Sequence, residues 1–148
     1  MKNLISLSTN QRHIWFDEKV NGVSAKFNIG GYAKITGPVD EFLLKKALIK
    51  VFEAEQVMLY SFIESDGIPF QYVCSNEIDL NILDFSNEID SDKTCQKWIL
   101  DSMKVALSTN SQLFETVFLK SGTSVYWFLK IHHILADGWA FSLIFKKV

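Results

Sequence analysis

Two adjacent histidines, followed by an aspartate and a glycine, form the reactive group with the clearest spacing in this sequence. They lie in HHILADG (residues 132–138), directly after an apolar run. An imidazole with an ordinary pKa of about 6.5 accepts a proton near neutral pH, so it can serve as a general base. Neighbouring strand residues point to opposite faces, so His132 and His133 cannot face one atom. The pair therefore predicts one proton-accepting group rather than two ligands of one centre.

A metal site is not expected from the remaining metal-binding residue types. Helical zinc pairs use histidines four residues apart, and His13 is the only histidine besides His132 and His133. Cys74 and Cys95 stand alone, without a CxxC spacing. GxSxG, GxxxxGK[ST] and GxGxxG are absent as well, so neither a serine hydrolase elbow nor a phosphate-binding loop is indicated.

Each residue of HHILADG also has an ordinary structural explanation. His133 could be a core histidine bonded to a backbone carbonyl, or it could reach a cleft at the end of its strand. Asp137 precedes an expected helix, where an N-cap carboxylate contributes about 1 kcal/mol. Gly138 either lets a ligand approach the backbone or relieves a tight turn. These residues alone predict a cleft histidine held by a structured turn, with no specific substrate.

The elements around this segment predict a buried central strand. SVYWFLKIHH (residues 124–133) is apolar on both faces and follows FETVFLK across the hairpin-like break at residues 121–123. WAFSLIFKKV (residues 139–148) is expected to be a helix. Further upstream, Ser8 caps a helix over residues 9–19, an extended stretch follows Gly30 and Gly31, and Asp40 precedes a helix with one apolar stripe.

The middle of the chain predicts a hairpin and a second amphipathic helix. VMLYSFI (residues 57–63) is interpreted as a strand, ESDG as a turn and PFQYVC as the hairpin partner. LDFSNEIDSD (residues 83–92) is interpreted as a loop, and residues 92–107 as a helix. Mixed helices and hairpins favour an α/β sandwich with a partly antiparallel sheet.

Composition restricts the possible partners. The 148 residues carry a net charge of -2 without a basic block, so nucleic acid is not an expected partner. There is no apolar run of 18 residues and no long apolar region of a signal peptide, which predicts a cytoplasmic protein without a membrane partner. Aromatic residues make up 14%, which predicts a large core or apolar surface that another body covers.

HHILADG resembles the His-His-x-x-x-Asp-Gly signature of condensation domains of nonribosomal peptide synthetases, which are chloramphenicol-acetyltransferase-like acyltransferases. LSTNQRHIWF (residues 7–16) is similar to the family's opening motif, and GPVD, SDGIPFQYV and DFS follow in the family's order. One motif departs: the family's Arg-His-Glu-x-Leu-Arg-Thr-x-Phe stands here as AEQVMLYSF (residues 54–62). Starter-type members vary most there, and FNIGGYAKITGPVD also resembles them.

The resemblance implies a fold and a reaction. The fold is a chloramphenicol-acetyltransferase-like α/β sandwich lobe with a mixed, largely antiparallel sheet flanked by helices, and residues 1–148 would form the N-terminal lobe without the second lobe. The reaction is amide formation between a carrier-bound thioester and a carrier-bound amine. His133 would be the catalytic residue, and His132 and Asp137 would support it structurally. Gly138 would line the path of the phosphopantetheine arm that each carrier protein supplies.

The resemblance also implies partners and leaves alternatives open. The partners would be upstream and downstream peptidyl carrier proteins, the C-terminal lobe and an adjacent adenylation domain, with no metal or directly bound cofactor. Half a tunnel should not catalyse, so the fragment alone is expected to be inactive. An epimerisation domain, a free-standing coenzyme A-dependent acyltransferase and a degenerate carrier-docking lobe remain alternatives. A heterocyclisation domain is disfavoured, because that relative replaces the histidine pair with aspartates.

Overall fold

The structure is a computed structural model that describes residues 3–74, 78, 80–110 and 113–148. Its main sheet has the strand order β2-β7-β6-β5, formed by β2 (Asn28–Thr36), β5 (Asn81–Asp84), β6 (Phe114–Ser121) and β7 (Ser124–His132). The β2–β7 and β6–β7 pairs are antiparallel, and β5 pairs with β6 in parallel. The predicted mixed, largely antiparallel sheet is therefore confirmed.

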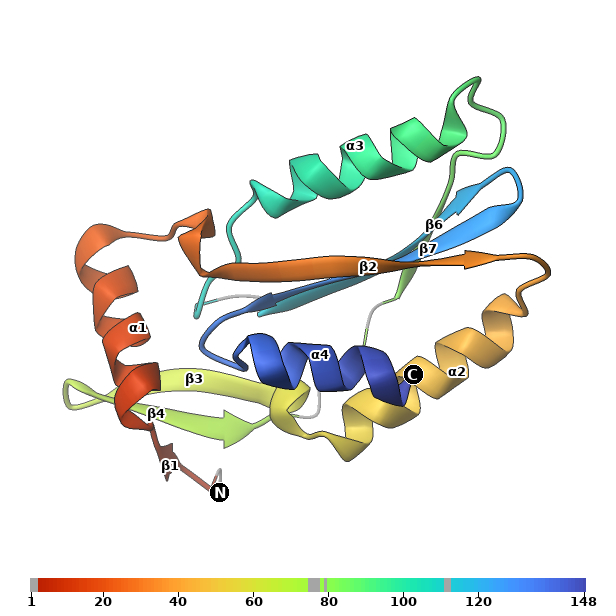
Figure 1. Ribbon diagram of the computed structural model, residues 1–148. Coiled ribbons are helices and arrows are strands. Elements are labelled where there is room, and N and C mark those ends of the chain that lie inside the picture. The colour runs from red at the N-terminus through yellow and green to blue at the C-terminus, as the bar shows by residue number, and fades with distance from the viewer. Residues whose placement is uncertain (1–2, 75–77, 79, 111–112) are drawn as a thin grey trace.

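Three helices cover the two faces of this sheet (Figure 1). One face carries α3 (Ser91–Met103), and the other carries α2 (Glu41–Ala54) and α4 (Gly138–Lys147). Every residue of β7 is buried, as expected for a central strand covered on both sides. Trp127 and Leu129 lie in the larger core with Phe52 of α2, whereas Tyr126 and Phe128 pack with Ile99 of α3.

A small second sheet lies beside α1 (Thr9–Asn21), with the strand order β1-β4-β3. It consists of β1 (Ile5–Ser6), β3 (Tyr60–Ser65) and β4 (Ile68–Val73). Asp66 and Gly67 make the tight turn between β3 and β4, and both have positive φ. The expected hairpin is confirmed. Ser8 begins α1 with a capping box to Gln11, so the expected cap at Ser8 is confirmed. Asp40 precedes α2 as expected, and its side chain caps that helix.

The structure corrects three expected boundaries. Residues Val57–Leu59 form a short 3-10 turn instead of a strand, because Leu59 donates its N–H to Gln56 and pairing with β4 starts at Tyr60. Leu83 and Asp84 are strand residues, not loop, because they pair with β6. Helix α3 ends at Met103 rather than at residue 107, because the side chain of Asn28 bonds the carbonyls of Met103 and Val105.

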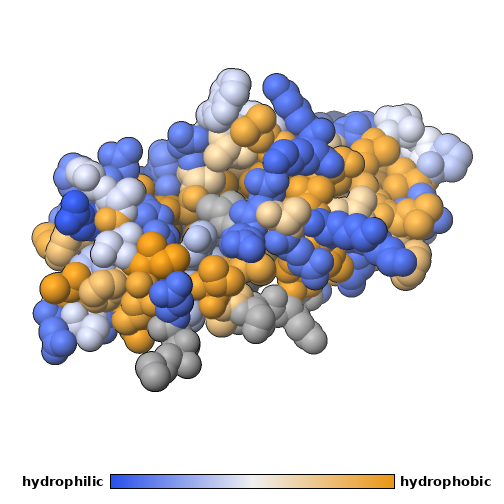
Figure 2. Space-filling view, turned by 90° about the horizontal axis from the view of Figure 1, so that it is seen from below, coloured by the Kyte–Doolittle hydropathy of each residue, from blue (hydrophilic) through white to orange (hydrophobic). Residues whose placement is uncertain are grey.

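Most aromatic side chains lie in the core or pack against it, and seventeen large apolar side chains are exposed in the described part of the chain. Phe16, Phe42 and Trp139 are exposed in the described part of the chain. Figure 2 shows hydrophobic patches interspersed with hydrophilic ones on the face seen from below Figure 1. The aromatic content thus serves mainly the large core, with a smaller contribution to the apolar surface.

Candidate active site around the HHILADG segment

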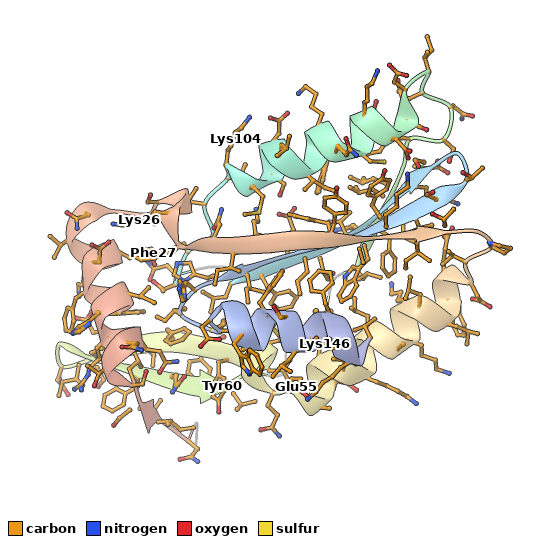
Figure 3. All side chains as sticks on the ribbon, in the orientation of Figure 1. Lys26, Phe27, Glu55, Tyr60, Lys104 and Lys146 are labelled. Atoms are coloured by element: carbon orange, nitrogen blue, oxygen red, sulfur yellow. The ribbon has the colours of Figure 1, made fainter. Side chains whose placement is uncertain are left out.

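His132 is the last residue of β7, and its ring is fully buried. Its Nδ1 accepts the backbone N–H of Ile134 at 3.2 Å, and its Nε2 lies 3.3 Å from Oε2 of Glu18. The ring of Phe27 lies 5.5 Å away between centroids, where a short 3-10 turn (Ala25–Phe27) enters β2 (Figure 3). Burial lowers the pKa of His132, and this effect outweighs the opposing attraction of Glu18. The ring is therefore neutral at pH 7.

His133 follows β7 directly, and its side chain is exposed. Its backbone N–H donates to the carbonyl of Phe27 at 2.8 Å, which continues the β2–β7 pairing by one residue. The core-histidine explanation is therefore wrong for His133. The buried ring is that of its neighbour His132, which accepts a backbone N–H instead of donating to a backbone carbonyl. The two rings differ because the strand alternation that separates them places His132 in the interior and leaves His133 at the surface.

Asp137 has the capping role that its position predicted. Its Oδ1 accepts the N–H of Ala140 at 2.8 Å, and its carbonyl accepts the N–H of Phe141 at 2.9 Å. Its extended backbone (φ -91°, ψ 179°) is usual for an N-cap. The carboxylate thus fixes the entry of the chain into α4 and the end of the turn that carries His133.

Gly138 is the first residue of α4 and is exposed. Its φ is not positive, and a Cβ built on it would meet no atom within 4 Å. The tight-turn explanation is therefore not supported. The space beside its backbone is open, which leaves room for a ligand to approach.

Two residues of α1 contact the HHILADG segment. Nε2 of Gln11 donates to the carbonyl of Ile134 at 3.2 Å and to Oε1 of Gln71 on β4 at 3.0 Å. Glu18, seven residues further along the same helix, is buried against His132. Sequence reasoning used Gln11 only as a motif position and missed Glu18. A charged residue two turns after Gln11 and three residues after the buried Trp15 was the available signal.

The described residues contain no group of three or more His, Cys, Asp or Glu side chains arranged to hold a metal ion. Within the described ranges, no helix has both the length and the apolar character needed to cross a bilayer. What the segment presents is an exposed imidazole on a rigid turn, with a neutral buried histidine behind it and open space at Gly138. That arrangement can accept a proton from a group brought to the surface beside α4.

Comparisons with known proteins place this geometry in a family. The model of the Condensation domain family matches residues 1–148. The chain is 32% identical over 146 residues to a dimodular nonribosomal peptide synthase of Bacillus subtilis (strain 168), covering 97% of this chain and 6% of that protein. It is 25% identical over 154 residues to enterobactin synthase component F of Escherichia coli (strain K12), covering 100% of this chain and 12% of that protein.

Solved structures agree with the family match. A variant of the starter condensation domain of rhizomide synthetase RzmA, in complex with C8-CoA, superposes with a TM-score of 0.91 at 25% identity, over 98% of this chain and 34% of that one. The first condensation domain of the calcium-dependent antibiotic synthetase shares the fold, with a TM-score of 0.87 at 21% identity. The chain spans about a third of these solved chains and 6 to 12% of the curated relatives above. It belongs to the condensation domain family of nonribosomal peptide synthetases.

Proposed function

We propose that this chain is the N-terminal lobe of a condensation domain that forms an amide between two carrier-bound substrates. The donor would be an acyl or aminoacyl thioester, and the acceptor would be the amine of a downstream aminoacyl thioester. Both would be carried on phosphopantetheine by upstream and downstream peptidyl carrier proteins. The observation that supports this reaction is the exposed imidazole of His133 on a turn fixed from both sides.

The proposed step needs one proton acceptor at the attacking nitrogen. The amine attacks the thioester carbonyl, and His133 takes a proton from that nitrogen as positive charge develops. The tetrahedral intermediate then collapses, the C–S bond breaks, and the departing thiolate takes a proton back from the imidazolium. An α-amine has a pKa near 8, so part of it is already neutral at pH 7. His133 therefore contributes mainly by holding the amine and removing its proton.

The other residues of the segment would act around this step. His132 and Asp137 would hold the turn, and Gly138 would let the phosphopantetheine arm pass close to the backbone. The open space at Gly138 supports this assignment. A second lobe would form the opposite wall of the substrate tunnel, and an adenylation domain would follow it. We expect the synthetase to work in the cytoplasm.

The donor is proposed to be an acyl group of the kind that starter modules accept. Two observations support this: AEQVMLYSF lacks both arginines and the histidine of the family motif, and the solved relative RzmA is a starter condensation domain. The same loss supports a second candidate, a degenerate lobe that docks carrier proteins without catalysing. An epimerisation domain is the third candidate. There, His133 would instead remove a proton from Cα of the carrier-bound aminoacyl substrate.

His133→Ala in a complete condensation domain that contains this chain separates these candidates. With loaded donor and acceptor carrier proteins, we expect turnover to fall at least about 100-fold, within the usual range for general base catalysis. His13→Ala is the matched control, because His13 is an exposed histidine on α1. An unchanged rate for His133→Ala would favour the docking lobe. Deuterium entering Cα from heavy water would favour epimerisation.

A further inference from the structure

Glu18 is a buried carboxylate that joins three separate parts of the chain. From α1, its Oε1 accepts the hydroxyl of Ser108 at 2.9 Å and the backbone N–H of Thr109 at 3.1 Å. Its Oε2 lies 3.3 Å from Nε2 of His132. Only 5% of Glu18 is exposed, and neither Oε2 nor His132 Nε2 has a hydrogen-bond partner in the described part of the chain. The contact between these two buried atoms is an ion-pair contact, without hydrogen-bond geometry.

The tautomer of His132 follows from its other nitrogen. Nδ1 accepts the N–H of Ile134, so in the neutral ring it carries no proton. The ring proton must then be on Nε2, where it faces Oε2 of Glu18. Three donors thus face the two oxygens of Glu18: a hydroxyl and a backbone amide, which donate to Oε1, and an imidazole N–H, which lies within ion-pair distance of Oε2. Because an ionised carboxylate has only acceptors, it places no donor against any of the three, whereas an amide side chain does.

The consequence reaches His133 through its neighbours. The backbone N–H of His133 donates to the carbonyl of Phe27. The backbone N–H of the next residue, Ile134, donates to Nδ1 of His132. If the His132 ring turns or changes tautomer, Ile134 loses its acceptor and the second of these anchors is lost. Among the described residues, the His133 side chain has no recorded hydrogen bond or ring contact, so its orientation depends on the neighbouring ring of His132.

We propose that Glu18 is a positioning residue for the condensation reaction, acting on His133 through the tautomer and orientation of His132. This inference rests on the catalytic role proposed for His133. In Glu18→Gln, whichever way the amide is turned, its NH2 group meets one of the convergent donors. The conflict is relieved only if His132 reorients or changes tautomer. Misplacing a reacting group by about 1 Å can reduce a rate 100-fold.

The test compares Glu18→Gln with Glu115→Gln in a complete condensation domain that contains this chain. Glu115 is the matched control, since it also loses a carboxylate contact, with Lys130 at 2.7 Å and with Ser102 at 2.7 Å, but does not contact His132. For Glu18→Gln we expect kcat to fall between 10-fold and 100-fold, with KM for the acceptor within twofold of wild type. Glu115→Gln should keep the wild-type kcat even if its melting temperature falls.

Nitrogen-15 NMR of the imidazoles supplies a readout that a general loss of stability would not change. The wild-type His132 should show a proton on Nε2 only, and Glu18→Gln should lose this pattern. Where Glu18→Gln does not fold, Glu18→Asp keeps an acceptor-only side chain that is one methylene shorter, and its kcat should be intermediate. Wild-type kcat in the folded Glu18 variant, with His133→Ala inactive, would overturn the positioning role alone. Full turnover by His133→Ala would instead overturn the proposed function and this inference with it.

Discussion

The protonation of His132 predicts how the stability of the fold depends on pH between 7.5 and 5.5. Burial lowers the pKa of this ring in the folded state below its usual value of 6.5. The unfolded chain therefore binds more protons than the folded chain once the pH falls below about 6.5. The stabilisation is complete above that pH and is lost progressively below it. We expect the free energy of unfolding to decrease as the solution is acidified through this range.

The size of the effect follows from a single proton. Each pH unit below the unfolded pKa changes the free energy of unfolding by at most about 1.36 kcal/mol, so the loss between pH 7.5 and 5.5 is at most about 1.4 kcal/mol. Urea unfolding curves at half-unit steps would measure it, with His132→Asn as the control in which this slope disappears. The lysine partners of Asp92 and Asp101 lower the pKa values of these carboxyls to about 2, so both groups change the free energy of unfolding only below about pH 4.

A rise in stability on acidification that His132→Asn removes would refute this reasoning. It would mean that the folded protein raises the pKa of His132 and holds it as the cationic partner of Glu18. The tautomer argument would then fail as well, because a cationic ring carries protons on both nitrogens. The experiment therefore also checks the basis of the role assigned to Glu18.

Two further substitutions test how Lys130 and Asp137 contribute to the free energy of unfolding. The ammonium of Lys130 is buried on β7 and contacts Ser102, the carbonyl of Val105 and Glu115. Lys130→Met should therefore lower the free energy of unfolding by about 2–4 kcal/mol, measured by urea unfolding. This is near the lower end for a broken buried ion pair, because Glu115 still reaches water. A loss below 1 kcal/mol would contradict this account, and Lys93→Met, at an exposed pair, should stay within about 1 kcal/mol of wild type. Asp137→Ala removes the N-cap of α4 and should lower the free energy of unfolding by about 1 kcal/mol, whereas Asp137→Asn should retain most of it. Equal losses in the two Asp137 variants would show that capping is not what the carboxylate contributes to stability.

Local patterns predicted the parts of the fold that local contacts determine. The caps at Ser8, Asp40 and Asp137, the turn at Gly67 and the two apolar faces of β7 all depend on residues close in sequence. The resemblance to condensation domains, carried by HHILADG and by the order of the other motifs, was confirmed at the level of the family. The catalytic role of His133 stays a prediction.

The expectations that failed, and the residue that was missed, depend on partners distant in sequence. Strand β5 is only four residues long and exists because β6, more than thirty residues later, pairs with it. The end of α3 is set by Asn28 on β2, whose amide bonds two carbonyls just beyond the helix. Glu18 looks like any charged residue of an amphipathic helix until Ser108, Thr109 and His132 are placed around it. The spacing of Gln11, Trp15 and Glu18 places Glu18 on the buried face of α1 but does not identify its partners.

The contacts between α1 and the turn after β7 also constrain the order of events during synthesis. Gln11 and Ile134 are 123 residues apart, and Glu18 and His132 are nearly as distant. Closing so large a loop has an entropic cost before either contact can form, so contacts of this kind are established late in folding. On the ribosome, α1 has no partner for these contacts until the turn after β7 has emerged. The geometry around His133 should therefore mature late, together with the pairing of β2 and β7, which joins residues almost as distant in sequence.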